Sequence, residues 1–224
     1  MTDAFFKQLG ISSDQMMQCA GQTLYMLFAA LFLGSITGLI LAFALVLTNK
    51  DGILRNRWIF ICTNTFINIV RSVPFIILMV FIMPFTKWLV GTRIGTTAAL
   101  VPLTLFIAPY LARLFENSFL EVDRGIIEAA QSMGASVWQI IWHFLLPEAR
   151  GSLILSVTTG TIGLLGATAM AGVIGGGGVG DLALTYGYER MNFPLMLFTV
   201  IVLIVFVQII QSIGNYFAFK TRNR

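Results

Sequence analysis

The sequence predicts an all-α integral membrane protein. Of its 224 residues, 57% are hydrophobic and 11% are charged, whereas roughly a quarter of the residues in a typical soluble domain are charged. The mean hydropathy is +0.86. Because a helix needs about 20 apolar residues to cross a bilayer, the chain can hold five or six spans joined by short loops. We therefore expect one membrane domain and no separate soluble catalytic domain.

Five apolar runs are each expected to form a membrane-spanning helix. They lie at about residues 24–47, 58–85, 95–115, 152–174 and 194–219. They define a membrane domain at 20–219, with an external segment at 1–19 and a cytoplasmic tail at 220–224. The second run is long for one span, and Pro74 and Pro84 are placed to break it or let it tilt. The first run is too long for a signal-peptide core and should remain as an anchor.

The distribution of lysine and arginine predicts the orientation in a cell inner membrane, because cytoplasmic loops carry an excess of both residues. Nine basic residues would face the cytoplasm: Lys50, Arg55, Arg57, Arg113, Arg124, Arg150, Lys220, Arg222 and Arg224. Four would lie outside: Lys7, Lys87, Arg93 and Arg190. This asymmetry favours an external N-terminus and a cytoplasmic C-terminus. Because the basic residues flank apolar spans instead of forming one patch, the net charge of +4 does not indicate nucleic-acid binding.

The chain offers few residues for catalysis or metal binding. Its one histidine, His143, would have to serve any Ser-His-Asp triad, and we interpret it as a helix-surface or helix-packing residue. No carboxylate or cysteine cluster has metal-ligand spacing. Cys19 and Cys62 lie near the starts of two consecutive spans, and therefore at opposite membrane faces, so no disulfide is expected. We predict a protein that is not an enzyme and has no metal or cofactor.

A glycine-rich run, GVIGGGGVGD, extends from Gly172 to Asp181 after the fourth apolar run. It lacks the Gly-Lys-Ser/Thr ending of a phosphate-binding loop, and it falls on the predicted external face, away from cytoplasmic ATP. Two interpretations remain. The run is either a flexible or tightly turned exit from the span, since glycine permits positive φ and close backbone approach, or an outer gate or docking surface for an external partner.

Polar residues inside the apolar runs are candidates for a translocation path. Arg71 is the only formal charge well inside a run, so it should face the protein interior or a cavity. Asn64 and Asn68 share its helical face, and this stripe either lines a path or ties helices together by hydrogen bonds. In the fourth run the hydroxyls of Ser156 and Thr159 suit a pore wall, although its many small residues equally suit close helix packing.

The segment at 121–150, which the orientation above places in the cytoplasm, is polar and helix-like from Asp123 onwards. Its apolar residues recur with helical spacing, and Gly134 offers a break. Small or polar side chains along it would let another protein approach the backbone closely: Glu128, Ala129, Ala130, Gly134, Ala135 and Ser136. Glu128 adds negative charge early in the helix, which suits the helix dipole. The segment is either a merely amphipathic surface helix or a docking site for a partner.

This segment resembles the signature of permease subunits of bacterial ATP-binding cassette importers, which reads Glu-Ala-Ala, three residues, Gly, nine residues, Ile, one residue, Leu-Pro. Glu128, Ala129, Ala130, Gly134, Leu146 and Pro147 match it at that spacing. Phe144 replaces the Ile, and Asp123, which can itself cap a helix, stands where a proline often opens the segment. Further stretches, including NIVRSVPFIILMVFIMPFTKWLVGT and GVIGGGGVGDLALTYGYERMN, are similar to methionine-importer permeases.

The resemblance implies a five-helix permease of the type I ABC-importer fold that works as a homodimer. It also implies two copies of a cytoplasmic ATPase, an external binding protein that delivers D- or L-methionine, and a coupling helix at Glu128 to Ser136 seated in the ATPase. Such a permease needs only two alternative packings whose balance its partners bias. The alternatives are a permease for another small amino acid or peptide-like solute, and an ATP-independent channel or carrier. The absence of an obvious internal repeat disfavours a secondary transporter built on inverted repeats.

Overall fold

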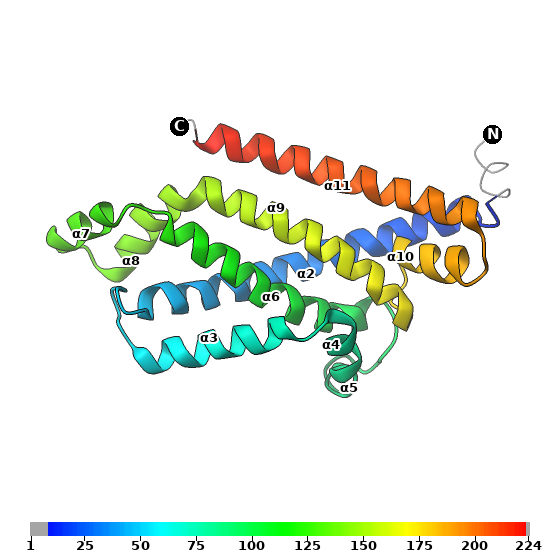
Figure 1. Ribbon diagram of the computed structural model, residues 1–224, viewed down its shortest axis with the longest axis horizontal. Coiled ribbons are helices and arrows are strands. Elements are labelled where there is room, and N and C mark those ends of the chain that lie inside the picture. The colour runs from blue at the N-terminus through cyan, green and yellow to red at the C-terminus, as the bar shows by residue number, and fades with distance from the viewer. Residues whose placement is uncertain (1–8, 223–224) are drawn as a thin grey trace.

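The computed structural model describes residues 9–222, and these form an elongated bundle of helices (Figure 1). No strand occurs within that range. The long helices are α2 (Ser13–Thr48), α3 (Arg57–Ser72), α6 (Thr96–Leu120), α9 (Leu146–Ala171) and α11 (Phe193–Arg222). The short elements are α4 (Phe75–Phe81), α5 (Met83–Val90), α7 (Arg124–Ser132), α8 (Val137–Ile140), the π-helix η1 (Ile141–Leu145), the 3₁₀ turn η2 (Gly172–Ile174), α10 (Val179–Asp181) and the π-helix η3 (Leu182–Tyr188).

The number of spans agrees with the prediction only when a broken helix is counted as one. Four helices in the described part of the chain are long and apolar enough to cross a membrane, and a fifth span results if α3 and α4 are joined. These two helices meet at an angle of 102°. Of the two alternatives for the run at 58–85, a break at Pro74 is the one that the structure shows. Val73 adopts extended backbone (φ −87°, ψ 125°) because the ring of Pro74 disfavours a helical residue before it.

The other helices extend beyond the apolar runs that predict them. Helix α2 begins at Ser13, eleven residues before the predicted start at 24, because Ser12 caps it by accepting a hydrogen bond from the Gln15 amide at 3.1 Å. Helix α6 continues to Leu120, beyond the predicted end at 115. Hydropathy marks the part of a helix that suits the bilayer, whereas caps and packing decide where the helix ends.

The core forms where α2 and α6 pack along one another and α9 joins them. Its fully buried side chains include Met26 and Leu27 of α2, Ile107 and Leu111 of α6, and Leu164 of α9. Helix α11 lies along α9, and α3 lies against α2 and α6 (Figure 1). Both α3 and α11 keep many apolar side chains exposed, as expected for helices that face lipid or another chain.

The glycine-rich run is a tight turn that joins three parts of the bundle. Positive φ angles occur at Gly175, Gly177 and Gly178 (75°, 72° and 92°), where side chains are disfavoured. Two side chains of α2 accept hydrogen bonds from this run at 2.9 Å: Gln22 Oε1 from the Gly178 amide and Thr23 Oγ1 from the Val179 amide. The interpretation as a tightly turned exit from the fourth span is confirmed, and two hydrogen bonds hold the run against α2.

Gly180 illustrates how closely this turn packs, because an added Cβ atom would overlap the backbone of Ala169 in α9. We expect Gly180→Ala to lower the unfolding free energy by about 1–3 kcal/mol through overpacking. The measurement is the thermal unfolding midpoint of the purified protein in detergent. Gly166→Ala is the matched control, since a Cβ there meets nothing within 4 Å; it should be neutral or stabilise by up to about 1 kcal/mol. Equal midpoints for the two variants would refute the close packing at Gly180.

Candidate coupling segment and polar path

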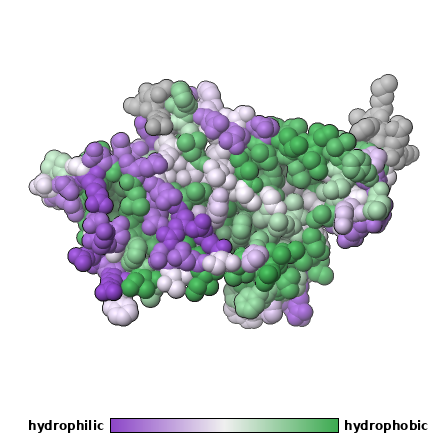
Figure 2. All heavy atoms as spheres, viewed as in Figure 1, coloured by the Kyte–Doolittle hydropathy of each residue, from purple (hydrophilic) through white to green (hydrophobic). Residues whose placement is uncertain are grey.

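One end of the bundle carries the segment that the sequence singles out. Helix α7 protrudes from the bundle there, followed by α8 (Figure 1). In the space-filling view hydrophilic residues gather over this end, whereas the opposite half of the visible face is mainly hydrophobic (Figure 2). The Arg124 guanidinium lies 3.2 Å from the Asp51 carboxylate and thereby joins the start of α7 to the α2–α3 loop. We call this end of the molecule the coupling end.

Local sequence explains both limits of α7. Asp123 Oδ1 accepts a hydrogen bond from the Gly125 amide at 2.6 Å, so the residue that departs from the family pattern caps the helix. Gly134 ends the helix with φ +80°, a conformation that favours glycine. The predicted helix start and break are both confirmed.

The predicted coupling residues do not all face outward. Glu128, Ala129, Gly134 and Ser136 are exposed, and Ala135 is half-buried. Ala130 is 0% exposed, so the expectation that its small side chain lies open to a partner is wrong. It packs inside the chain because α7 folds back against η1. Ser136 also has a structural role: its Oγ accepts from the Gln139 amide at 3.4 Å, while Gln139 Oε1 accepts from the Ser136 amide at 2.8 Å.

Leu146 and Pro147 lie in the first turn of α9, directly after η1. The apolar run predicts a span that begins at about residue 152, separate from the segment before it. Instead, residues Val137–Ile174 form one uninterrupted helix through α8, η1 and α9. Pro147 does not end the helix because it stands near the start of α9, where the altered hydrogen bonding of the π-turn accommodates a residue without an amide hydrogen.

The two asparagines of the polar stripe on α3 bind Arg113 of α6. The Arg113 guanidinium of α6 donates to Asn64 Oδ1 and to Asn68 Oδ1, the latter at 2.9 Å. Its other nitrogen, Nη1, forms an ion pair with Glu116 Oε2 at 2.7 Å. Arg71 is exposed in the last turn of α3, so it does not face the interior of this chain, and the alternative that it faces a cavity stays a prediction. The structure favours the helix-tying interpretation for Asn64 and Asn68.

Sequence reasoning missed Arg113 and Glu116 as a partly buried pair because the third helix was expected to end at 115. The helix continues to Leu120, which places Arg113 two turns inside it. A signal was available in the sequence, since Arg113 and Glu116 are three residues apart and therefore adjacent on a helix.

The two hydroxyl residues proposed for a path differ in their surroundings. Ser156 is buried and lies 2.9 Å from Ser118 Oγ of α6, and it also donates to the Leu114 carbonyl at 3.3 Å. Its contacts therefore support helix packing. Thr159 is exposed on α9, so it remains available to line a path.

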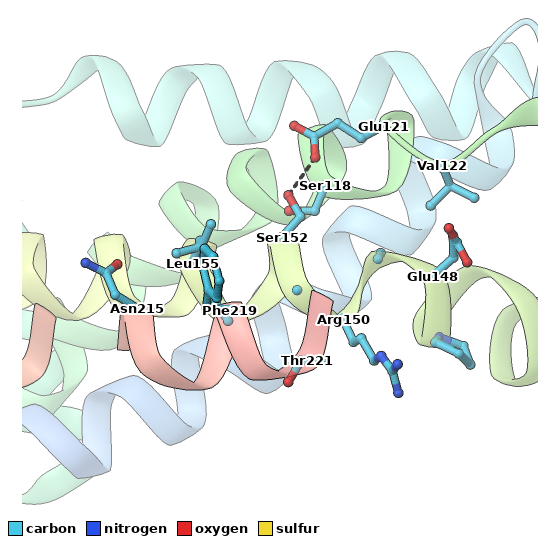
Figure 3. Close-up of a pocket in the computed structure, with 14 residues that line it drawn as sticks. Ser118, Glu121, Val122, Glu148, Arg150, Ser152, Leu155, Asn215, Phe219 and Thr221 are labelled. Atoms are coloured by element: carbon cyan, nitrogen blue, oxygen red, sulfur yellow. Dashed lines mark hydrogen bonds between the residues drawn. The ribbon is translucent and has the colours of Figure 1, made fainter. Parts of the chain in front are cut away.

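A cleft of ≈ 860 Å³ opens at the coupling end between the C-terminal parts of α6 and α11 and the start of α9 (Figure 3). Glu121 closes one wall by accepting a hydrogen bond from Ser152 Oγ at 2.7 Å. The remaining lining combines the charged Glu148 and Arg150 with apolar Leu155 and Phe219. Neither Arg71 nor Thr159 lines this cleft.

The described residues that could bind a metal ion lie apart from one another. Within 9–222 no group of three His, Cys, Asp or Glu side chains is placed to hold a metal ion. His143 is exposed, with Nδ1 3.2 Å from the Gln139 carbonyl of its own helix. An apolar helical bundle with a protruding small-residue helix at a polar end is typical of a membrane permease.

The chain belongs to the family of binding-protein-dependent transport system inner membrane components, which it matches over residues 34–223. It is 49% identical over 205 residues to the probable D-methionine transport system permease protein MetI of Vibrio cholerae, covering 92% of this chain and 91% of that one. It is 43% identical over 171 residues to the methionine import system permease protein MetP of Bacillus subtilis, covering 76% and 77% of the two chains. The family and fold predictions are confirmed.

Solved structures agree with this assignment. The chain superposes with a TM-score of 0.91 on a chain of the MetNI methionine ABC transporter in inward-facing conformations, at 38% identity and with coverage of 94% of this chain and 99% of that one. A structure of an amino acid ABC transporter shares the fold, with a TM-score of 0.77 at 19% identity.

The network around Arg113 should contribute measurably to stability. Arg113→Leu leaves Glu116 without its ion-pair partner, so we expect the unfolding free energy to fall by about 3 kcal/mol. The double variant Arg113→Leu with Glu116→Leu removes both charges and should recover at least half of that loss. Denaturant unfolding of the purified proteins in detergent measures the unfolding free energy of the single and the double variant. If the double variant is as unstable as the single one, the ion pair is not the source of the effect.

Proposed function

We propose that this chain is the membrane-spanning subunit of an ATP-driven methionine importer, in which it works as a homodimer. Two copies of a cytoplasmic ATPase would drive it, and an external binding protein would deliver D- or L-methionine. The substrate assignment is supported by relatives of 41–49% identity named as D-methionine permeases over more than nine-tenths of this chain. The likeness to the MetNI methionine ABC transporter supports the ATPase partner.

The observation that carries the proposal is the exposed coupling helix at the polar end of the bundle. Glu128 and Ala129 present a carboxylate and a small side chain on α7, and Gly134 leaves the backbone open after it, since a Cβ there would meet nothing within 4 Å. A cleft in an ATPase could therefore accept α7 closely. Ala130, Ser136, Leu146 and Pro147 would act indirectly, by fixing α7 and α8 against α9.

Energy would enter this protein through that contact. Closure of the ATPases on ATP would move α7, and the rigid connection through α8 and η1 would carry the movement into α9. Catalysis would reside in the ATPase, and this chain would contribute two alternative packings whose balance the partners shift. The exposed Thr159 and Arg71 and the cleft at the coupling end are candidates for the path, which a second copy of the chain would help to enclose.

The coupling end would face the cytoplasm. Arg124, Arg150 and Lys220 belong to helices at this end. Towards the opposite end, Lys87 belongs to α5, and Arg93 and Arg190 lie in the connections before α6 and α11. The Gly95 amide, which donates to the Gly175 carbonyl at 3.1 Å, keeps the segment after Arg93 beside the glycine-rich run. This sorting of basic residues supports an external N-terminus and a cytoplasmic C-terminus. Lys7 and Arg224, which also enter that argument, lie outside the described residues.

Gly134→Asp tests the docking site. The substitution places a branched, charged side chain where the ATPase would approach the backbone. We expect the protein to reach the membrane but to lose co-purification with the ATPase, and ATP-driven methionine uptake in proteoliposomes to fall at least tenfold. Gly91→Asp is the matched control, because Gly91 is also exposed, has φ +86° and has no atom within 4 Å of an added Cβ.

Normal uptake by Gly134→Asp would contradict the docking site. Uptake by the unmodified chain without any ATPase would instead support an ATP-independent channel or carrier. Uptake of other amino acids by the complex, with none of methionine, would overturn the substrate assignment alone.

Single cysteines test the orientation. In a background with Cys19→Ala and Cys62→Ala, Ile94→Cys and Leu54→Cys place thiols at two exposed apolar positions, one near each end of the bundle. A membrane-impermeant maleimide should label Ile94→Cys in intact cells and Leu54→Cys only after permeabilisation. The reverse pattern would invert the assigned topology.

A further inference from the structure

The helix that runs from the coupling end into the bundle contains one wide turn. In η1 the Leu146 amide donates to the Ile141 carbonyl, five residues earlier, instead of to the carbonyl four residues earlier. Such a π-turn accommodates one extra residue without interrupting the helix. Regular α-helix precedes and follows it, in α8 and α9.

Pro147 follows this turn directly and gives a physical reason for it. In a regular α-helix the ring of Pro147 would collide with the carbonyl of His143, and no amide hydrogen would bind that carbonyl. The π-turn shifts the preceding carbonyls away from the ring. Proline at 147 therefore disfavours a regular helix through residues 141–147, although α6 shows that this chain can keep prolines, Pro102 and Pro109, inside an α-helix.

The extra residue also decides which side chains are buried. An α-helix turns by about 100° per residue, so in a regular helix Trp138 and Trp142 would lie within about 20° of Ala149, and Ile140 about 180° from it. Ala149 is buried in the bundle at 2% exposure. The observed burial is the opposite: Ile140 is 1% exposed, whereas Trp138 is 70% and Trp142 is 60% exposed. One residue absorbed by the π-turn rotates α8 by about 100°, which moves Ile140 from about 180° to about 80° from Ala149 and Trp138 from about 20° to about 80°. The two side chains then lie on opposite sides of that direction, and α8 also packs against α7.

The rotation of α8 determines where α7 lies. Helix α7 contacts both α8 and η1, and its Ala130 is 0% exposed. Ile127 of α7 belongs to the same apolar cluster as Leu145 and Ala149. If α8 turned by a further 100°, these contacts would be lost and the exposed face of α7 would point elsewhere.

We propose that the π-turn at Ile141–Leu145, favoured by Pro147, sets the rotational phase of the coupling segment relative to α9. Pro147 is a positioning residue: it acts on the docking face through the turn that it favours. This inference rests on the proposed function, because the phase matters for transport only if α7 docks an ATPase.

The test deletes the extra residue of the π-turn in two backgrounds, one that keeps Pro147 and one that carries Pro147→Ala. His143 is the residue to delete, because it is exposed and bonds only within its own helix. Deleting it alone forces Pro147 into a regular helix, so we expect ATP-driven uptake by the reconstituted complex to fall at least tenfold. Deleting it together with Pro147→Ala gives a regular helix in the native phase, and uptake should return to within about threefold of wild type. His143→Ala controls for loss of the imidazole and should leave uptake unchanged.

Two results would overturn the inference. If the double variant is as inactive as the deletion alone, a regular helix in the native phase does not preserve transport. The role of the π-turn is then not to set the rotational phase of the coupling segment. If the deletion alone transports normally, the turn is not required. For each variant, the amount of co-purified ATPase and its rate of ATP hydrolysis are also measured. If the deletion of His143 alone prevents assembly with the ATPase, these measurements still show whether adding Pro147→Ala restores it. Failure of the wild-type complex to transport methionine would refute the proposed function instead.

Discussion

The structure depends on one constraint: each backbone amide and carbonyl inside the bilayer needs a hydrogen-bond partner within the protein, because the bilayer offers no water to replace it. It makes the described chain helical, and it also explains the three places where helices are interrupted or altered. At Pro74 the helix breaks and bends by 102°. At Pro147 it widens into a π-turn and continues. At the glycine-rich run, side chains of α2 supply the acceptors that the Gly178 and Val179 amides need.

The same constraint governs the polar side chains between the helices. Arg113 lies well inside α6, and its guanidinium is satisfied by Glu116 and by two asparagines of α3. Ser118 and Ser156 satisfy one another between α6 and α9. These contacts, together with the hydrogen bond from Ser152 to Glu121, add polar links to the apolar packing and help to fix the relative positions of α3, α6 and α9.

The bundle therefore connects its two ends mechanically. At one end the glycine-rich run holds α9 and α10 close to α2, and at the other a continuous helix carries the coupling segment outward from α9. For a member of a binding-protein-dependent transport family, this arrangement allows a partner at the coupling end to act on the spans without any reactive group in this chain. Helix α9 is the element through which such a movement would pass.

The sequence alone determined the fold class, the approximate spans and the position of the coupling segment, since these depend on hydropathy, on Gly134 as a breaker and on residue spacing along the chain. The tertiary structure decided which polar residues meet. Arg113 rather than Arg71 binds Asn64 and Asn68, because α6 extends further than its apolar run, and Ala130 is buried because α7 folds back on η1. The π-turn was also beyond sequence reasoning: its position follows from Pro147, but the face that it buries depends on packing against residues distant along the chain.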